Sequence, residues 1–488
     1  MEEERGLVEK TKGSGGEDEL EVRRFSDAIR VFTEESKKQW MLAAPIAMTA
    51  LFTYGINSSV QIFAGHLSAL QLSAVSTALT LCSNFTTGFL LSMGSALETL
   101  SGQAFGAGQV GMLSIYMQRT WIILIISSIL MSPIYIFATP ILSFFGQQSD
   151  IAFLAGRFAL LILPQQFAMA ISYPSQKFLL TQSKVLPLAF IACTSLVLHL
   201  CALWFFTSVL EWGSTGSAIA FDVSSCAMAL FQVIYIMFWC KDAWNGFSWF
   251  AFKDLWPFIK LSLSSAFMLL LADWYGALVV FLAGLLNNAQ VTVASVSIWM
   301  NINSWEYMLV TGFLSATSVR LSNELGSGRP RAGKYVVIVS GSTTLFISLI
   351  SSSLILATWD KFPLLFTSSK EVQDSASTAV YILAIILMLT AIQSTLTGSI
   401  TGTGWQGLVA YINLGCYYLL GIPLAAALGF LLHWGVQGIW IGLISGYMAQ
   451  TLVLIAMVCK TNWKGQVIQA EKRLQFWSGE DQQTKWVE

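Results

Sequence analysis

The chain has 488 residues, of which 55% are hydrophobic and only 11% are charged. A soluble globular chain carries about 25% charged residues, so this chain has too little charge to cover the surfaces of soluble domains. Its formal net charge of -1 gives no basic excess for binding nucleic acid. The apolar residues fall into long runs along most of the sequence, which predicts a multi-span membrane protein in a lipid bilayer.

The seven cysteines and three histidines give no pattern of a disulfide framework or a metal centre. The cysteines are odd in number, form no C-x-x-C pair and lie mostly inside apolar runs, as small buried hydrophobic residues do. The histidines are far apart in the sequence. We therefore expect no metal and no cofactor. The sequence contains no cluster of catalytic residue types, so we do not expect an enzyme.

The first residues differ from the rest of the chain. Residues 1–40 are charged, contain Gly and Ser and have almost no apolar periodicity, which predicts a flexible tail in which only Phe25–Phe32 resembles a short amphipathic helix. No secretory signal pattern precedes the first apolar run, which begins after Trp40. The first span itself must therefore start membrane insertion.

Apolar runs of about 20 residues, the length of a membrane-crossing helix, follow one another to the end of the chain. They predict an all-α polytopic membrane protein with twelve transmembrane helices, at 41–63, 72–96, 118–138, 153–174, 186–207, 216–239, 258–284, 291–316, 335–358, 378–400, 408–431 and 436–459.

The basic residues predict the orientation of these spans. Of the 26 Lys and Arg residues, all except Arg157, Lys361 and Lys370 fall in the tails and loops of one side. The positive-inside rule places that side, with both termini, in the cytoplasm. The predicted parts are a tail, an N-lobe, a cytoplasmic linker that runs into span seven, a C-lobe and a C-terminal tail, at 1–40, 41–240, 241–260, 258–459 and 460–488.

The sequence repeats itself at an offset of about 220 residues. Gly-x-Gly at 106–108 matches Gly-x-Gly at 326–328, and Trp-Gly at 212–213 matches Trp-Gly at 434–435. Two six-span halves in the same orientation are related by a pseudo-two-fold axis along the membrane normal. Such duplicated bundles place a binding cavity between their halves, which predicts an alternating-access transporter.

Two corresponding loops carry a family resemblance. The loop after the second span reads LETLSGQAFGAG at 97–108, and its counterpart reads SVRLSNELGSG at 318–328. Together with Ala64-Gly65-His66-Leu67, Gln118-Arg119, Trp305-Glu306 and Gly404-Trp405-Gln406, these loops resemble the plant branch of the multidrug and toxic compound extrusion (MATE) transporters over roughly residues 36–465. The stretch AYINLGCYY at 410–418 is most similar to the subgroup that includes vacuolar flavonoid carriers and some anion channels.

The resemblance implies a secondary-active exporter of organic compounds, such as flavonoid- or alkaloid-like metabolites and xenobiotics, in exchange for protons. It places the protein in the vacuolar membrane, with the plasma membrane as the alternative. We expect a monomer whose partners are a small organic solute and protons. An anion channel of the chloride type on the same scaffold is the alternative function, with anions as its partner.

The sequence departs from the family at two acidic positions. Plant members usually carry a glutamate where alignment places Ala272, and many relatives have an aspartate where this chain has Thr390. Asp273 is acidic but lies about 100° further around a helix. Because ionisable residues inside spans are rare and functional by default, Asp273 is the proton-coupling candidate, with a structural buried acid as the alternative.

Other polar and aromatic side chains inside spans are candidates for the substrate cavity. Glu306 follows Asn303 by one turn on the same helix face, and a second polar stripe lies along the first span. Polar points amid aromatics suit a large, flat, partly apolar ligand, whereas hydrogen bonding between helices is the structural alternative. The cavity candidates are Glu306, Asn303, Tyr54, Asn57, Gln61, Trp274, Tyr275, Gln393, Asn413 and Tyr417.

The remaining polar and small residues have structural or gating interpretations. Asp222 is expected to contact His199, and the four-residue spacing of Gly438, Gly442 and Gly446 favours close helix packing. Charged residues at the cytoplasmic ends of the spans are candidates for an inward gate, although solvated charge is the commoner outcome. These gate candidates are Glu98, Arg119, Arg320 and Glu324.

Overall fold

The computed structural model describes residues 18, 24–253, 255–285, 289–367, 369–378 and 380–478, and within these ranges the chain forms helices and loops without a β-strand. It divides into two compact units, one formed by Met48–Ala266 and the other by Met1–Ala47 with Phe267–Glu488. The divisions fall inside α2 (Phe25–Leu67) and α11 (Leu255–Gly284), so each of these helices contributes to both units.

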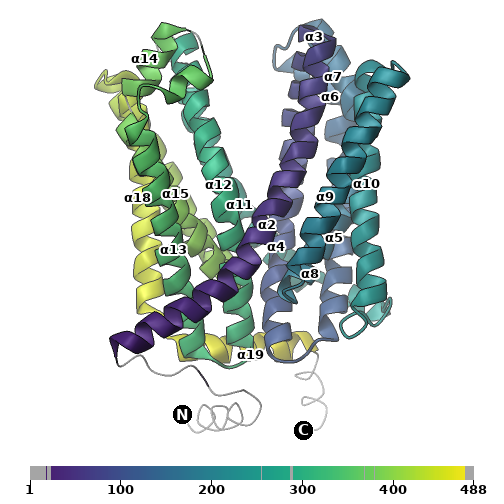
Figure 1. Cartoon of the computed structure of the whole chain (residues 1–488), viewed down its shortest axis with the longest axis vertical. Helices are drawn as coiled ribbons and strands as arrows, with labels where there is room; N and C mark the ends of the chain where they lie inside the picture. The colour runs from purple at the N-terminus through teal and green to yellow at the C-terminus, as the bar shows by residue number, and fades with distance from the viewer. Residues whose placement is uncertain are drawn as a thin grey trace. The chain divides into compact units, whose positions relative to one another are not determined.

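The unit formed by Met48–Ala266 contains most of the first half of the chain (Figure 1). Its elements after α2 are α3 (Ala69–Ala78), η1 (Leu79–Asn84), α4 (Phe85–Gly106), α5 (Met112–Ile136), α6 (Ala138–Phe144), α7 (Ser149–Leu161), α8 (Leu163–Thr181), α9 (Val185–Trp204), η2 (Phe205–Val209), α10 (Gly213–Trp239) and η3 (Trp249–Phe252).

The other unit repeats this pattern of long helices and short breaks. Its elements after α11 are α12 (Ala289–Gly326), α13 (Pro330–Ala357), η4 (Phe362–Leu365), α14 (Lys370–Thr378), α15 (Val380–Thr403), α16 (Gln406–Asn413), η5 (Leu414–Gly421), α17 (Ile422–Ala426), η6 (Ala427–Leu431), α18 (Gly435–Lys460) and α19 (Trp463–Ser478).

These helices confirm the twelve predicted membrane helices in two halves. Among the described residues, nine helices are long and apolar enough to cross a membrane, and a tenth span follows if α7 and α8, bent by 46° at their junction, count as one. The first and eighth predicted spans lie inside α2 and α12, which are longer helices that also carry charged residues. Helices satisfy every backbone hydrogen bond internally, as hydrocarbon surroundings require.

A helix begins at Phe25, where the sequence predicted a short one, but it extends over residues 33–40, which corrects the flexible tail predicted there. α2 begins at Phe25 and continues without a break into the first span. Its Glu35 accepts hydrogen bonds from Arg320, 285 positions away, and its Gln39 donates to the Val336 carbonyl, 297 positions away. The sequence around Glu35 and Gln39 does not indicate these distant partners. Of the rest of the predicted tail, only residues 18 and 24 are described.

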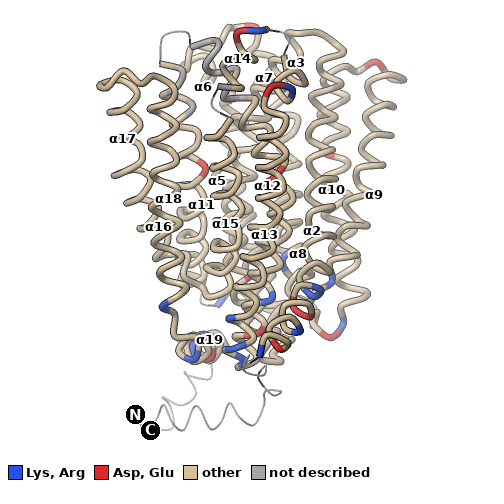
Figure 2. Tube along the Cα trace, turned by 60° about the vertical axis from the view of Figure 1, so that its left-hand side comes forward, with Lys and Arg blue, Asp and Glu red and all other residues tan. Residues whose placement is uncertain are grey.

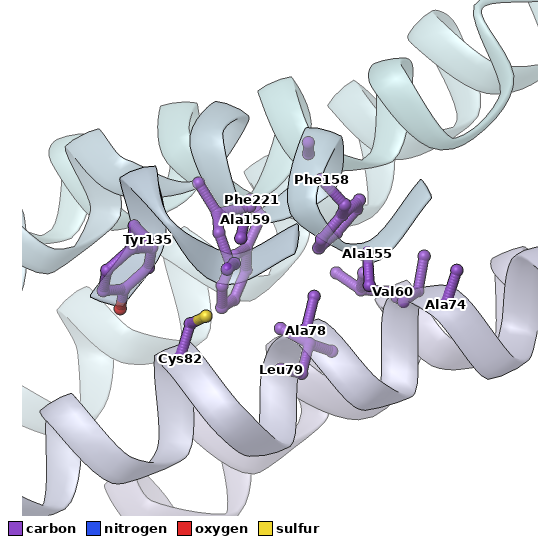
Figure 3. Packing of buried hydrophobic residues seen from close by; sticks show 14 of the residues in the cluster. Val60, Ala74, Ala78, Leu79, Cys82, Tyr135, Ala155, Phe158, Ala159 and Phe221 are labelled. Carbon is purple, nitrogen blue, oxygen red and sulfur yellow. The ribbon is translucent and has the colours of Figure 1, made fainter. Parts of the chain in front are cut away.

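The core of the Met48–Ala266 unit is built from small and branched side chains. Val60 of α2, Ala78 of α3 and Ala155 of α7 are fully buried against one another's helices. Figure 3 shows Val60 and Ala155 near Phe158, with Tyr135 and Cys82 at the other end of the same cluster. Small residues let membrane helices approach closely, so this face forms a packed wall rather than a cavity.

Candidate functional site

A cluster of tyrosines lies inside the unit that contains α11 to α19. Tyr275 of α11 stacks on Tyr417 of η5 with ring centroids 4.5 Å apart and an interplanar angle of 4°. Tyr447 of α18 meets both rings edge-on, at 5.3 and 5.5 Å. Aromatic pairs at these separations add about 0.5–1.5 kcal/mol each beyond their burial, so the cluster is a rigid feature of the unit.

Glycines and a π-helical segment make room for this cluster. The Tyr275 hydroxyl donates to the carbonyls of Gly442 and Leu443, at 3.1 and 3.0 Å. A Cβ at Gly446 would lie 2.3 Å from the Tyr275 hydroxyl oxygen, and one at Gly442 would lie 2.3 Å from the Ala425 backbone. The expected close packing along Gly438, Gly442 and Gly446 is therefore confirmed. π-helical turns occur frequently at functional sites, and η5 carries Tyr417.

An amide network continues from the tyrosines. Gln393 of α15 donates to Gln450 Oε1 at 3.0 Å, and Gln450 Nε2 donates to Asn413 Oδ1 at 3.3 Å. Asn413 in turn donates to the Met268 carbonyl of α11 at 2.9 Å. The predicted residues Gln393, Asn413, Tyr275 and Tyr417 are thus brought together in one unit. Buried polar networks of this kind fix a unique arrangement when their members are satisfied.

Asp273 and Trp274 lie beside the tyrosine cluster on α11. Both residues are exposed, whereas the neighbouring Tyr275 is fully buried. Asp273 is close enough to Tyr307 of α12 and to Tyr447 of α18 to act electrostatically on their phenols. The exposed carboxylate of Asp273 and the exposed ring of Trp274 offer a ligand one negative charge and one flat apolar surface.

Glu306 of α12 is buried, with 5% of its surface exposed. Neither carboxylate oxygen accepts a hydrogen bond of ordinary geometry from a described group. The Ser351 hydroxyl of α13 lies within electrostatic reach but donates to the Ile347 carbonyl at 3.1 Å. An unpaired buried carboxylate is costly, whereas a protonated one or one paired with a cation is not. Glu306 therefore has the surroundings of a proton or cation site.

Asn303 lies one turn before Glu306 and joins α12 to α15. Its Oδ1 accepts a hydrogen bond from the Thr390 hydroxyl at 3.2 Å. Thr390 stands where the family resemblance led us to expect an aspartate, and it leaves a neutral hydrogen bond at this helix contact.

The polar stripe of the first span lies in the Met48–Ala266 unit. Gln61 donates to Asn57 Oδ1 at 3.3 Å, and Ser76 of α3 donates to Gln61 Oε1 at 3.4 Å. Tyr54, one turn earlier, is 47% exposed. A groove of about 650 Å³ adjoins this stripe and is lined by Ser76, Thr77, Thr80, Leu81, Phe85, Ile134 and Ile141.

Asp222 was expected to contact His199, but the two side chains do not contact each other. Asp222 accepts a hydrogen bond from the Gln165 backbone N–H at 3.1 Å, next to the bend between α7 and α8. The His199 Nδ1 lies 3.0 Å from the Ser224 hydroxyl. Asp222 was predicted to make a structural contact, and it does. Its partner is the Gln165 backbone N–H at the helix bend and not His199.

The gate candidates lie in separate charged clusters. In the Met48–Ala266 unit, Glu98 forms an ion pair with Lys177, and Arg119 donates to the Phe250 carbonyl at 3.4 Å. Lys177 is a partner that the sequence analysis did not identify.

In the other unit, Arg320 bridges Glu35 and Glu324 at 2.8 and 2.7 Å, and Arg329 also pairs with Glu324 at 2.8 Å. Burial alone would lower the pKa of Arg320, but the two carboxylates outweigh it and hold that pKa above its ordinary value. The guanidinium therefore stays charged. Glu35 and Arg329 are members of this cluster that the sequence analysis missed.

The sequence analysis also missed three residues of α18 that complete the candidate site. Tyr447, Gln450 and Thr451 lie at the helical spacing that places them on one face, and Thr451 accepts from Gln393 at 3.3 Å. Polar side chains at this spacing inside an apolar span were the signal that could have identified them.

Comparisons with known proteins agree with this architecture. A protein-family model described as MatE matches residues 45–205 and 264–427, two stretches that begin 219 positions apart. Protein DETOXIFICATION 34 of Arabidopsis thaliana is 49% identical over 464 residues, 95% of this chain and 86% of its own length. Protein DETOXIFICATION 35 of the same plant is 47% identical and covers 97% of both chains.

Solved structures give the same result for the fold. The crystal structure of the eukaryotic MATE transporter AtDTX14 superposes with a TM-score of 0.85 at 30% identity, covering 91% of this chain and 100% of that chain. The Vibrio cholerae MATE transporter VcmN, solved as a point mutant, gives a TM-score of 0.80 at 15% identity, covering 89% and 99%. At that identity the likeness concerns the fold alone.

Proposed function

Because the chain belongs to the MATE family of membrane transporters, we propose that it exports flavonoid- or alkaloid-like organic compounds from the cytosol in exchange for protons. It is a multi-pass membrane protein and not an enzyme. The proposal places it in the vacuolar membrane as a monomer, with both termini in the cytoplasm.

The observation that carries this proposal is the carboxylate beside the tyrosine cluster. Trp274 beside Asp273 offers an exposed aromatic ring, Tyr447 is partly exposed, and the Gln393 amide network offers hydrogen-bond donors and acceptors. Ligand sites of this kind combine mostly apolar walls with a few placed polar groups. An aromatic organic compound fits these surroundings better than a small hydrated ion.

The same residues argue against the anion-channel alternative. Anion pathways are lined by Arg or Lys, whereas the described residues of the candidate site include the carboxyl group of Asp273 and no Arg or Lys. A charged Asp273 would repel a permeating anion. We therefore favour a carrier over a channel.

Proton coupling is assigned to Asp273, with Glu306 as a second carboxyl group in the same unit. Coupling requires a group that holds a proton in one state of the transport cycle and releases it in another. Burial disfavours the charged carboxylate and access to water favours it, so a change of access to Asp273 would drive both steps. Ala272 and Thr390 cannot take this role because neither side chain titrates.

The experiment is uptake of a metabolite panel into sealed vesicles with and without an imposed pH gradient. Asp273→Asn fixes a neutral side chain of nearly the same shape, so it should still bind and exchange substrate but lose gradient-driven accumulation. Asp360→Asn, at an exposed acid in a loop, is the matched control and should accumulate substrate as the wild type does.

Further outcomes separate the alternatives. Partial recovery in Ala272→Glu/Asp273→Asn would show that the carboxylate can act from either position. Full accumulation in Asp273→Asn would make Asp273 a structural residue. Wild-type currents that follow voltage and ignore the pH gradient would instead establish the channel.

A further inference from the structure

The segment between α10 and α11 contains an unusual density of aromatic residues. Residues 244–256 read WNGFSWFAFKDLW, and lysines stand just before this stretch, near its end and just after it, at Lys241, Lys253 and Lys260. We refer to residues 241–253 as the aromatic loop; Trp256 lies in the first turn of α11. We propose that the aromatic loop inserts into the adjoining membrane leaflet and binds the headgroups of anionic phospholipids.

The aromatic loop is fixed to α5 by side-chain hydrogen bonds. Gln118 Nε2 donates to the Gly246 carbonyl at 2.9 Å, and Gln118 Oε1 accepts from the Ser248 backbone N–H at 2.9 Å. Arg119 donates to the Phe250 carbonyl at 3.4 Å. One glutamine therefore satisfies two backbone groups of the loop at once, which holds the loop in a defined position on the unit.

Aromatic packing reinforces this clamp. Trp121 of α5 lies 6.0 Å from Trp244 and 6.4 Å from Phe247, measured between ring centroids. The ring of Phe250 lies 5.3 Å from the Arg119 guanidinium carbon and 5.5 Å from the Lys253 ammonium nitrogen. The inner side of the loop is thus a packed surface, and its remaining aromatic rings face outward.

The contacts with α5 place the loop at the edge of the hydrocarbon region. Gln118 lies roughly 9 Å along the helix from its first residue, Met112, at 1.5 Å per residue, and it is the first residue of the third predicted apolar span. After α10 ends at Trp239, the chain therefore turns back along the unit instead of extending into water. Residues at this depth meet the headgroup layer of a bilayer.

Several aromatic side chains of the loop are exposed at this depth. Trp249 is 87% exposed and Phe247 is 74% exposed. Exposing such large rings to water is unfavourable, whereas Trp is enriched at membrane interfaces because its ring has an apolar body and a polar N–H. Phe252 and Trp256 continue the exposed set.

The charges of the loop select the kind of lipid. Lys241 and Lys253 of the loop and Lys260 of α11 are exposed, and over residues 241–260 these three lysines outnumber the acidic residues, Asp242 and Asp254, by one. Basic residues beside a membrane are attracted to leaflets that carry anionic lipids. Lys253 stands next to the exposed rings, so an inserted Trp249 brings its ammonium group to the level of lipid phosphates.

Tryptophan quenching by brominated lipids tests this proposal on the full chain in nanodiscs. The emission difference between wild type and Trp249→Phe isolates Trp249 among the 18 tryptophans. We expect brominated phosphatidylserine to quench this difference at least twofold more than brominated phosphatidylcholine at the same content. Lys253→Gln should reduce that ratio toward one while both variants remain monodisperse.

Trp359→Phe is the matched control, because Trp359 is also exposed, at 52%, and lies in a loop on the opposite predicted side of the membrane. Its emission difference should be insensitive to Lys253→Gln. Absence of quenching at Trp249 by either lipid would show that the loop faces water and would overturn the proposal. Equal quenching by brominated phosphatidylserine and brominated phosphatidylcholine would overturn the headgroup preference. Loss of the difference between the two lipids when inorganic phosphate is added would also overturn it.

Discussion

At the residue scale, Glu306 combines burial with two carboxylate oxygens that lack ordinary hydrogen-bond partners in the described chain. The sequence indicated this residue as a cavity candidate, but spacing alone could not separate a hydrogen-bonded acid from an unpartnered one. Only the packing of α12 against its neighbours gives that distinction.

The first prediction is that Glu306→Gln retains the fold and loses transport. An amide resembles a protonated carboxylic acid in shape and charge, so folded protein recovered by size-exclusion chromatography should match the wild type. Gradient-driven uptake should fall about tenfold or more, since the amide cannot exchange a proton. Glu371→Gln, at an exposed acid, is the control. Loss of folded Glu306→Gln protein would show that the carboxylate has a structural partner instead.

The second prediction concerns Glu35 and its neighbour Glu34. The Glu35 side chain is 3% exposed and accepts two hydrogen bonds from Arg320, whereas Glu34 is 53% exposed and pairs with Arg30. Breaking a buried pair costs about 3–5 kcal/mol, and breaking an exposed one costs about 0–1 kcal/mol. Glu35→Gln should therefore lower the thermal unfolding temperature in detergent clearly more than Glu34→Gln. Equal shifts would mean that the Arg320 cluster contributes little to stability.

At the element scale, the sequence predicted what apolar length and composition control. Each predicted span coincides with one helix or with up to four consecutive helical segments, because roughly 20 apolar residues in a bilayer have no other way to satisfy their backbone. The continuation of α2 from Phe32 into the first span and the docking of α19 could not be predicted in this way. α19 is held by the Arg473 guanidinium, which donates to the Thr403 carbonyl at 2.6 Å, a contact between distant segments.

In the candidate site, too, the sequence predicted individual polar residues but not the contacts between them. Gln393, Asn413 and Tyr417 were identified because polar residues in apolar spans are conspicuous. Their connection through Gln450 depends on how α18 packs beside η5, and the π-helical geometry of η5 shifts side chains relative to an α-helix. Periodicity calculated for a regular helix therefore could not give the contacts of the cluster.

The third prediction tests the close packing of α18. A Cβ at Gly442 would lie 2.3 Å from the Ala425 backbone, whereas one at Gly415 would meet no atom within 4 Å. Gly442→Ala gains about 1 kcal/mol of helix propensity but loses about 1–3 kcal/mol to overpacking, so it should destabilise the protein. Gly415→Ala should be neutral or stabilising. The thermal unfolding temperatures of both variants test this prediction. A Gly442→Ala protein as stable as the wild type would contradict the tight contact.

At the scale of the whole molecule, the internal repeat and the charge asymmetry are the sequence features that organise the fold. The repeat indicated two six-span halves, and the two matched family stretches recur with nearly the same offset. Most basic residues of the unit that contains α19 gather at the helix ends near α19, whereas α14, which begins at Lys370, lies at the opposite end (Figure 2). The retention of Lys and Arg on the cytoplasmic side sets orientation during insertion, so this end is expected to face the cytosol.

The last prediction is that tags at both termini lie in the cytosol. Arg157, Lys361 and Lys370 are the basic residues predicted on the other side, against all the remaining Lys and Arg, and an even number of spans returns the chain to the side where it began. In sealed vesicles whose cytosolic face is inward, added protease should leave both terminal tags intact until detergent is added. A tag inserted after Lys361 should be cleaved without detergent, which shows that the protease is active at the outer face. Cleavage of either terminal tag in intact vesicles would contradict the topology, and with it the assignment of the aromatic loop to the cytosolic leaflet.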